Sequence, residues 1–285
     1  MKRVIAVVVA AVVCLPVPAF ADGPGLRAVS LPFLWPRADE ISRIASGAGE
    51  AWIAGGSSAR GGPSTYVARF DGSAFQRVAI PDGAIGMLTT GPAGTFISHW
   101  DLDPDQRLLK RTGDAWTAVA VPGIDNVEDL QGLSATDAWA VGARQDLQLG
   151  SFPAVAHFDG TAWSSVPPPP VTGNEWFLKV VPIAADDVWA ITQKHLAHWN
   201  GSAWVLIAPP AGLADLADLT VDASGAPWVA QEEAAQTSQA PYRYTGSEWE
   251  MVTVPDGAEV HDLAAVSAGV WGVGRQGDGP AAFNG

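Results

Sequence analysis

A short phrase resembling Ala-Trp-Ala-Val-Gly recurs six times along this chain of 285 residues. Its aromatic residue returns at intervals of 44, 43, 50, 39 and 43 residues, at Trp52, Phe96, Trp139, Trp189, Trp228 and Trp271. A period of about forty residues, built of short β-rich segments separated by Gly, Asp, Asn and Pro, is typical of units of four strands. The spacing therefore predicts an all-β chain made of six copies of one unit.

The third copy shows the unit most clearly. Residues 128–133 and 138–142 alternate as two strands joined by a tight turn, and residues 154–158 and 162–166 form two more. The last two strands are joined by Asp159-Gly160, which suits a hairpin because glycine accepts the positive φ that such turns require. Four antiparallel strands per unit and six units predict a six-bladed β-propeller.

The blades are expected at 39–81, 84–122, 126–167, 175–209, 214–255 and 259–285. The sixth blade lacks a fourth strand within its own range. Residues 26–32 closely match the fourth-strand phrases at 75–81 and 116–122. We therefore expect residues 22–32 to supply the closing strand of the sixth blade, which removes a raw sheet edge.

Residues 1–21 are typical of a secretory signal peptide. Lys2 and Arg3 precede an apolar run, and the segment ends in Ala19-Phe20-Ala21, so cleavage is expected after Ala21. A membrane anchor needs about 20 apolar residues without interruption, and prolines at positions 16 and 18 interrupt this run. We expect a secreted chain of residues 22–285, a single domain. It has no disulfide because the one cysteine, Cys14, is removed.

The charge of the chain excludes several partners. The formal net charge is −14, and removing Lys2 and Arg3 leaves 14 basic against 30 acidic residues, or −16. Such a surface repels nucleic acid and anionic lipid headgroups. With 48% hydrophobic residues the chain can still bury a core. We expect a monomer that neither binds nucleic acid nor inserts into a membrane after signal cleavage.

The arrangement resembles six-bladed β-propellers, and its repeat is similar to the Trp-rich blades of exported bacterial proteins. Gly55-Gly56 alone matches the double glycine of kelch blades, and residues 222–228 are similar to the Asp-box turn of sialidases, with one residue too many. The likeness to kelch, Asp-box and NHL propellers concerns architecture. It therefore carries over no catalytic residue.

Loop lengths point to one end of the disc. The loops between second and third strands are expected to be long at 55–65, 144–152 and 231–240, whereas first-to-second and third-to-fourth turns are short. In a propeller the long loops and the crossings between blades emerge at the same end. We call this end the loop face and the other end the plain face; binding sites favour the loop face.

Most of the thirteen tryptophans occupy repeated positions. Ten are expected to pack between blades: Trp52, Trp139, Trp189, Trp228 and Trp271 on second strands, Trp116, Trp163, Trp204 and Trp249 on fourth strands, and Trp199 at a third-strand position shared with Phe70, Phe158, Tyr244 and Phe283. Trp35, Trp100 and Trp176 fit no repeated position and fall on the loop face. Each either folds over its own blade or is displayed for stacking against a sugar or peptide.

Polar residues near the starts of the innermost strands are expected to ring the mouth of the central channel: Arg43, Glu128, Asp129, Lys179, Asp218, His261 and Asp262. These groups either bind a ligand or cap strand ends. Three alternating carboxylates at Asp101, Asp103 and Asp105 suggest calcium. A solvated hairpin tip is the simpler interpretation, and no cofactor or metal site is assigned. His157 and His198 stand where other blades have arginine, which assigns them to the blade.

Three functions fit these features. The leading hypothesis is a non-catalytic recognition disc that binds an extracellular carbohydrate or peptide through Trp35, Trp100 and Trp176, with Asp129, Asp218 and Asp262 as polar partners. The second is a lyase or glycosidase that uses Glu128, His261 and Asp262 as acid and base at the channel mouth. The third is a scaffold that docks another protein.

Overall fold

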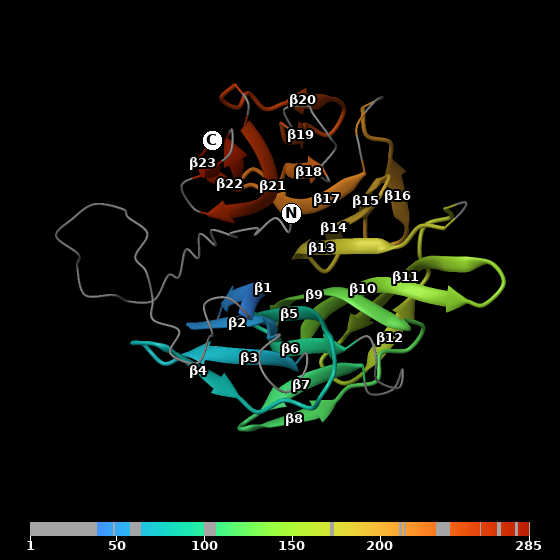
Figure 1. The fold of residues 1–285 in the computed structure, drawn as a ribbon. Helices are drawn as coiled ribbons and strands as arrows, with labels where there is room; N and C mark the ends of the chain where they lie inside the picture. Colours follow the sequence, from blue (N-terminus) through green and yellow to red (C-terminus); the bar gives the residue numbers. More distant parts are fainter. Residues whose placement is uncertain are drawn as a thin grey trace.

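The computed structural model describes residues 39–284 apart from residues 48, 58–63, 100–106, 172–173, 211–212, 214, 232–239, 257, 267–268 and 277–278. These residues form 23 strands in six antiparallel sheets, and the predicted six-bladed β-propeller is confirmed. The sheets follow one another around a common centre in Figure 1, from the sheet of β1 to β4 at lower left to the sheet of β21 to β23 at upper left. No helix long and apolar enough to cross a membrane is found in this part of the chain.

Each sheet is one blade, and its strands run in chain order from the centre outward. The first three blades are β1 (Asp39–Gly47), β2 (Glu50–Ser57), β3 (Ser64–Phe70) and β4 (Phe75–Val78); β5 (Ile85–Gly91), β6 (Gly94–His99), β7 (Leu108–Thr112) and β8 (Ala115–Ala118); β9 (Asn126–Ser134), β10 (Asp137–Asp146), β11 (Gly150–Phe158) and β12 (Trp163–Val166). The others are β13 (Phe177–Ala184), β14 (Asp187–Thr192), β15 (Leu196–Trp199) and β16 (Trp204–Ile207); β17 (Leu216–Val221), β18 (Pro227–Gln231), β19 (Tyr242–Tyr244) and β20 (Trp249–Met251); β21 (Ala258–Val266), β22 (Gly269–Gln276) and β23 (Gly279–Asn284). The predicted closing strand at 22–32 lies outside the described residues.

The tryptophans of the repeat join neighbouring blades as wedges. The second-strand indole of one blade meets the fourth-strand indole of the next, with ring centroids 6.2 Å apart for both Trp52 and Trp116 and for Trp139 and Trp204. Trp52 and Trp139 are buried. Because aromatic pairs bury large apolar areas in preferred edge-on geometries, these contacts are a main source of cohesion between blades.

In four blades the second-strand aromatic also lies against a polar or charged partner directly opposite it on the third strand. Trp139 lies 4.5 Å from the His157 ring, and Trp189 lies 4.0 Å from the His198 ring. Both histidines are bound through Nε2 to an aspartate of their own blade, Asp137 or Asp187, at 2.9 Å. Arg69, Lys110 and Arg243 hold the same place in other blades. The two histidines therefore belong to the architecture of the repeat.

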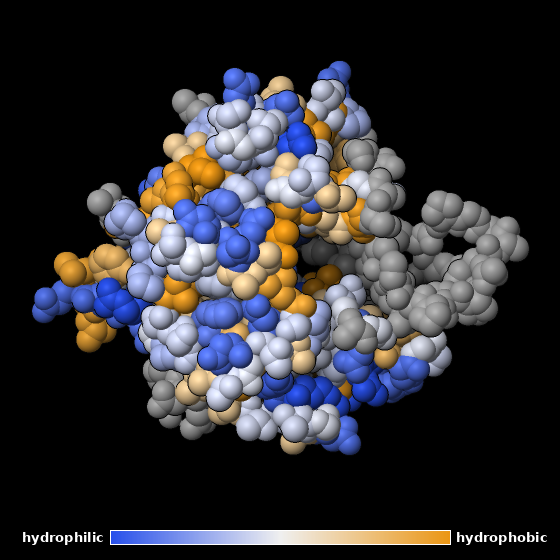
Figure 2. Space-filling view, turned by 180° about the vertical axis from the view of Figure 1, so that it is seen from behind, coloured by the Kyte–Doolittle hydropathy of each residue, from blue (hydrophilic) through white to orange (hydrophobic). Residues whose placement is uncertain are grey.

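The segment 144–152, expected to be a loop, is mostly strand. β10 and β11 stay paired as far as Asp146 and Gly150, and the turn is closed by Asp146 Oδ1, which accepts the amide hydrogens of Gln148 and Leu149. The resulting hairpin projects from the disc, at the left of Figure 2, and its tip exposes Leu147 and Leu149. The third blade is therefore extended by a longer β-hairpin and not by an irregular loop.

The third strand of the sixth blade departs from the repeated register. In the third blade Phe158 pairs with Ala138, the residue before Trp139. In the sixth, Phe283 pairs with Gly272, the residue after Trp271. The expectation that Phe283 shares the position of Phe158 is therefore wrong by two residues. The pairing of Gln276 with Gly279 leaves a two-residue connection, and so short a hairpin sets the register.

Candidate functional site

All six innermost strands carry an irregularity near their beginning, at the loop face. One residue in each is skipped in the pairing with the second strand: Ser42, Gly86, Glu128, Leu178, Ala217 and His261. The residues that follow are structurally equivalent: Arg43, Met87, Asp129, Lys179, Asp218 and Asp262. Because a bulge redirects the side chains beside it, this repeated feature gathers polar groups of five blades near one end of the channel, whereas Met87 of the second blade is buried in the core.

Lys179 lies among three of the predicted aspartates. Its Nζ is 3.3 Å from Asp218 Oδ1, and the charge of Asp218, then those of Asp129 and Asp262, raise the pKa of Lys179 against the opposing effect of its burial. The structure thus brings together residues from four blades that lie up to 133 positions apart, 129 to 262. The lysine stays charged at all physiological pH values.

Asp218 is affected in the opposite direction by the same surroundings. Burial, together with the nearby charge of Asp262, raises its pKa to about 6, although Lys179 and the amide of Leu263 favour the ionised form. Three carboxylates stabilise the charged form of Lys179, whereas a single ammonium group stabilises the charged forms of all three carboxylates. This asymmetry explains why both partners of one ion pair have a raised pKa.

Two of the predicted ligand-binding carboxylates hold neighbouring blades together. Asp129 Oδ2 accepts the Val180 amide hydrogen at 3.0 Å, and Asp218 Oδ2 accepts that of Leu263 at 2.6 Å. Each aspartate therefore links its own innermost strand to that of the next blade. Both are buried, so they stabilise the ring and orient Lys179 more than they meet solvent.

Five polar side chains remain accessible at the mouth. Arg43 and Asp262 are exposed, and Glu128, Lys179 and His261 are half-buried. Burial raises the pKa of Glu128, and the charge of Arg43 partly offsets this. His261 Nε2 lies 3.6 Å from Glu259 Oε2. Glu128, His261 and Asp262 are not joined to one another by hydrogen bonds, so they do not form a ready proton relay.

Of the three tryptophans that fit no repeated position, Trp176 lies among the described residues. Trp176 is half-buried in the crossing before β13, and its amide donates to Gln193 Oε1 at 3.1 Å. Trp35 and Trp100 lie outside the described residues, as do Asp101, Asp103 and Asp105. Among the residues that are described, no group of three His, Cys, Asp or Glu side chains is placed to hold a metal ion.

One polar cluster at the loop face was not predicted from the sequence. Glu175 is buried, and its Oε1 lies 2.7 Å from His195 Nδ1 and also accepts the Thr192 hydroxyl. These residues come from the crossing into the fourth blade and from its second-to-third turn. Neither segment repeats in other blades, so periodicity could not reveal the pair. The turn that carries His195 also binds the Trp176 amide, through Gln193.

Comparisons with known proteins support the architecture. No protein-family model matches the sequence, and no curated protein is similar to it. A catalytically inactive virginiamycin B lyase from Staphylococcus aureus is similar in structure, with a TM-score of 0.59 and 11% identity over 84% of this chain and 79% of that chain. The GH74 xyloglucanase of Xanthomonas campestris has a TM-score of 0.56 and 13% identity over 82% of this chain and 44% of that chain.

A third similar structure, YCF48 from Cyanidioschyzon merolae, has a TM-score of 0.53 and 12% identity over 83% of this chain and 80% of that chain. At these identities the likeness shows the propeller fold alone. Propellers with different names and activities share it, so function must be argued from the site.

Proposed function

We propose that this chain is an exported, non-catalytic recognition propeller that binds a carbohydrate or peptide at the channel mouth. One observation supports the proposal: a bulge recurs in the innermost strands, and in four blades the residues beside it are accessible donors and acceptors at one end of the channel. Arg43 and Lys179 donate, and Glu128 and Asp262 accept. Sugar hydroxyls and peptide groups need both kinds of partner in one place.

The balance of charge narrows the ligand class. Two cations face four carboxylates, those of Glu128, Asp129, Asp218 and Asp262. An anionic ligand would meet net repulsion, so a neutral glycan or a peptide with basic residues fits better. Trp176, and with it Trp35 and Trp100, are proposed as apolar contacts around this polar centre.

The proposal is tested by screening glycans and peptides for binding to the chain that begins at Asp22. For a ligand so found, Asp262→Asn is expected to weaken binding about tenfold, because a hydrogen bond to a charged group contributes about 1.5 kcal/mol or more. Asp186→Asn makes the same change at an exposed position in the first-to-second turn of the fourth blade, at the plain face, and should leave the dissociation constant unchanged. Equal affinities for both variants would contradict a site at the mouth.

Export rests on the predicted signal peptide. We expect the chain to be recovered outside the cytoplasm with Asp22 as its first residue. N-terminal sequencing of the exported form measures this directly. Recovery in the cytoplasm with residues 1–21 still attached would contradict it.

A second candidate is an enzyme of the lyase or glycosidase kind, favoured by the names of two similar structures, a lyase and a xyloglucanase. In this chain Glu128, His261 and Asp262 would supply acid and base. It predicts product formation from a bound ligand, lost in His261→Ala. Binding without turnover favours the recognition propeller.

A further inference from the structure

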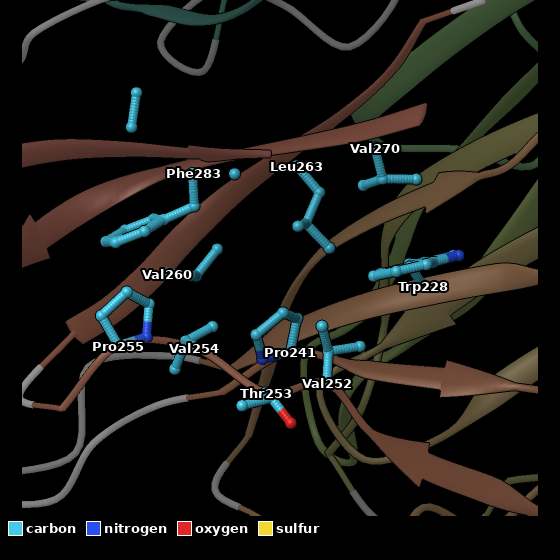
Figure 3. Close-up of a pocket in the computed structure, with 12 residues that line it drawn as sticks. Trp228, Pro241, Val252, Thr253, Val254, Pro255, Val260, Leu263, Val270 and Phe283 are labelled. Atoms are coloured by element: carbon cyan, nitrogen blue, oxygen red, sulfur yellow. The ribbon is translucent and has the colours of Figure 1, made fainter. Parts of the chain in front are cut away.

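An apolar cavity of about 280 Å³ lies between the fifth and sixth blades. Figure 3 shows Trp228 and Thr253 of the fifth blade on one side, with Val260, Leu263 and Val270 of the sixth on the other. Phe283 closes the end, where its shifted register places it opposite Gly272. No described side chain fills the centre.

The corresponding space between the third and fourth blades is occupied. There Phe177, Val180, Val188 and Ala190 of the fourth blade cluster with Trp139 of the third, and Trp204 from the fourth strand fills the middle. The bulge and the second-strand tryptophan align these positions with Val260, Leu263, Val270, Gly272 and Trp228. The cavity is thus the place that a fourth-strand side chain of the sixth blade would take.

In two of the spaces that a fourth-strand tryptophan fills between blades, its indole nitrogen also makes a hydrogen bond to the preceding blade. Trp116 Nε1 donates to the carbonyl of Ala79 at 3.0 Å, and Trp249 Nε1 donates to that of Ala208 at 2.9 Å. Each acceptor follows the fourth-strand aromatic of the preceding blade by four residues, Phe75 or Trp204. The same offset from Trp249 reaches Thr253, which lines the cavity.

We propose that Leu26 occupies this cavity and that residues 26–32, which lie outside the described part of the chain, pair with β23 as the fourth strand of the sixth blade. Leu26 holds the position of Phe75 and Trp116 in the matching phrases. It is smaller than an indole, which suits a cavity that Phe283 already narrows. Its side chain needs no hydrogen-bond acceptor.

The connection to the first blade is long enough for this placement. Six residues, 33–38, separate Pro32 from β1. Other crossings from the closing proline to the next innermost strand range from two residues, 256–257, to nine, 168–176. The segment therefore has the reach of an ordinary crossing between blades.

Placing Leu26 in this cavity also supports the channel mouth. Val260 and Leu263 of β21 line the cavity, and His261 and Asp262 lie between them in the sequence. Filling the cavity therefore fixes the strand that carries two of the accessible polar groups. This consequence, unlike the placement of Leu26 itself, rests on the proposed function.

Paired substitutions in the chain that begins at Asp22 test the placement of Leu26 without any ligand. Leu26→Asp is expected to lower the melting temperature by about 5 °C or more, because a carboxylate would enter an apolar cavity. Arg27→Asp is the matched control, since its equivalents Gln76 and Thr117 are exposed, and it should change little.

A chain beginning at residue 33, mixed with a synthetic peptide of residues 22–32, tests the location. The peptide should raise the melting temperature of the shortened chain, and the same peptide with Leu26→Asp should not. Equal melting temperatures for Leu26→Asp and Arg27→Asp, or a shortened chain that ignores the peptide, would overturn the proposal. Dimers of the full chain that separate when residues 22–32 are removed would instead show that this segment fills the cavity of a second copy. That result would also overturn the proposal.

Discussion

Replacing Gly142 with alanine is expected to lower the free energy of unfolding by about 3 kcal/mol or more. Gly142 lies on β10 beside the bulge of β9, and a Cβ there would be 2.0 Å from the carbonyl oxygen of Asn126 and 2.9 Å from the amide of Glu128. Both are backbone atoms, so the contact can be relieved only by moving the innermost strand. The same movement would displace Glu128 and Asp129 at the channel mouth.

Thermal and urea unfolding measure this effect, with Gly91→Ala as the control. Gly91 ends β5 and has open space where a Cβ would point, so the melting temperature of that variant should stay near that of the parent chain. If Gly142→Ala unfolded like Gly91→Ala, the close approach at the bulge would be wrong.

The second large effect concerns the pH dependence of stability. Burial raises the pKa of Asp218 to about 6 in the folded chain, against 3.8 for an unperturbed aspartate. The folded state therefore binds this proton more tightly. Its contribution to stability is complete below pH 3.8 and is lost as the pH rises to about 6. Over this window we expect it to fall by about 3 kcal/mol at most.

Asp218→Asn removes this titration while its side-chain oxygen can still accept the Leu263 amide hydrogen. Urea unfolding between pH 4 and pH 7 should show that the variant gains stability relative to the parent chain as the pH rises. Asp186→Asn, at an exposed position, should follow the parent chain at every pH. A constant difference between Asp218→Asn and the parent chain would refute the assignment.

The fold was predictable because the repeat depends on residues that packing requires in every blade. An indole such as Trp139 must meet the fourth strand of the next blade, so its spacing records the blade length. Register was less predictable where the repeat weakens. In the sixth blade the short connection before Gly279 shifts Phe283 by two residues, and near Asp146 side-chain capping extends two strands through an expected loop.

Strand positions alone predicted a polar ring at the channel mouth, and the structure places Lys179 near Asp129, Asp218 and Asp262. That these residues bind a ligand stays a prediction. What the sequence could not reveal is that Asp129 and Asp218 accept amide hydrogens from the next blade. That role depends on the distance between two innermost strands. The Glu175 and His195 pair was missed because it occurs in one blade only.

Hydrogen exchange measured by mass spectrometry, with and without a ligand from the binding screen, tests the central claim most directly. We expect slower exchange at the bulges of the innermost strands, around residues 42–43, 128–129, 178–179 and 261–262, with the turns at 135–136 and 185–186 unchanged. Protection confined to those turns, or to the outer strands β8, β12 and β16, would contradict a binding site at the channel mouth.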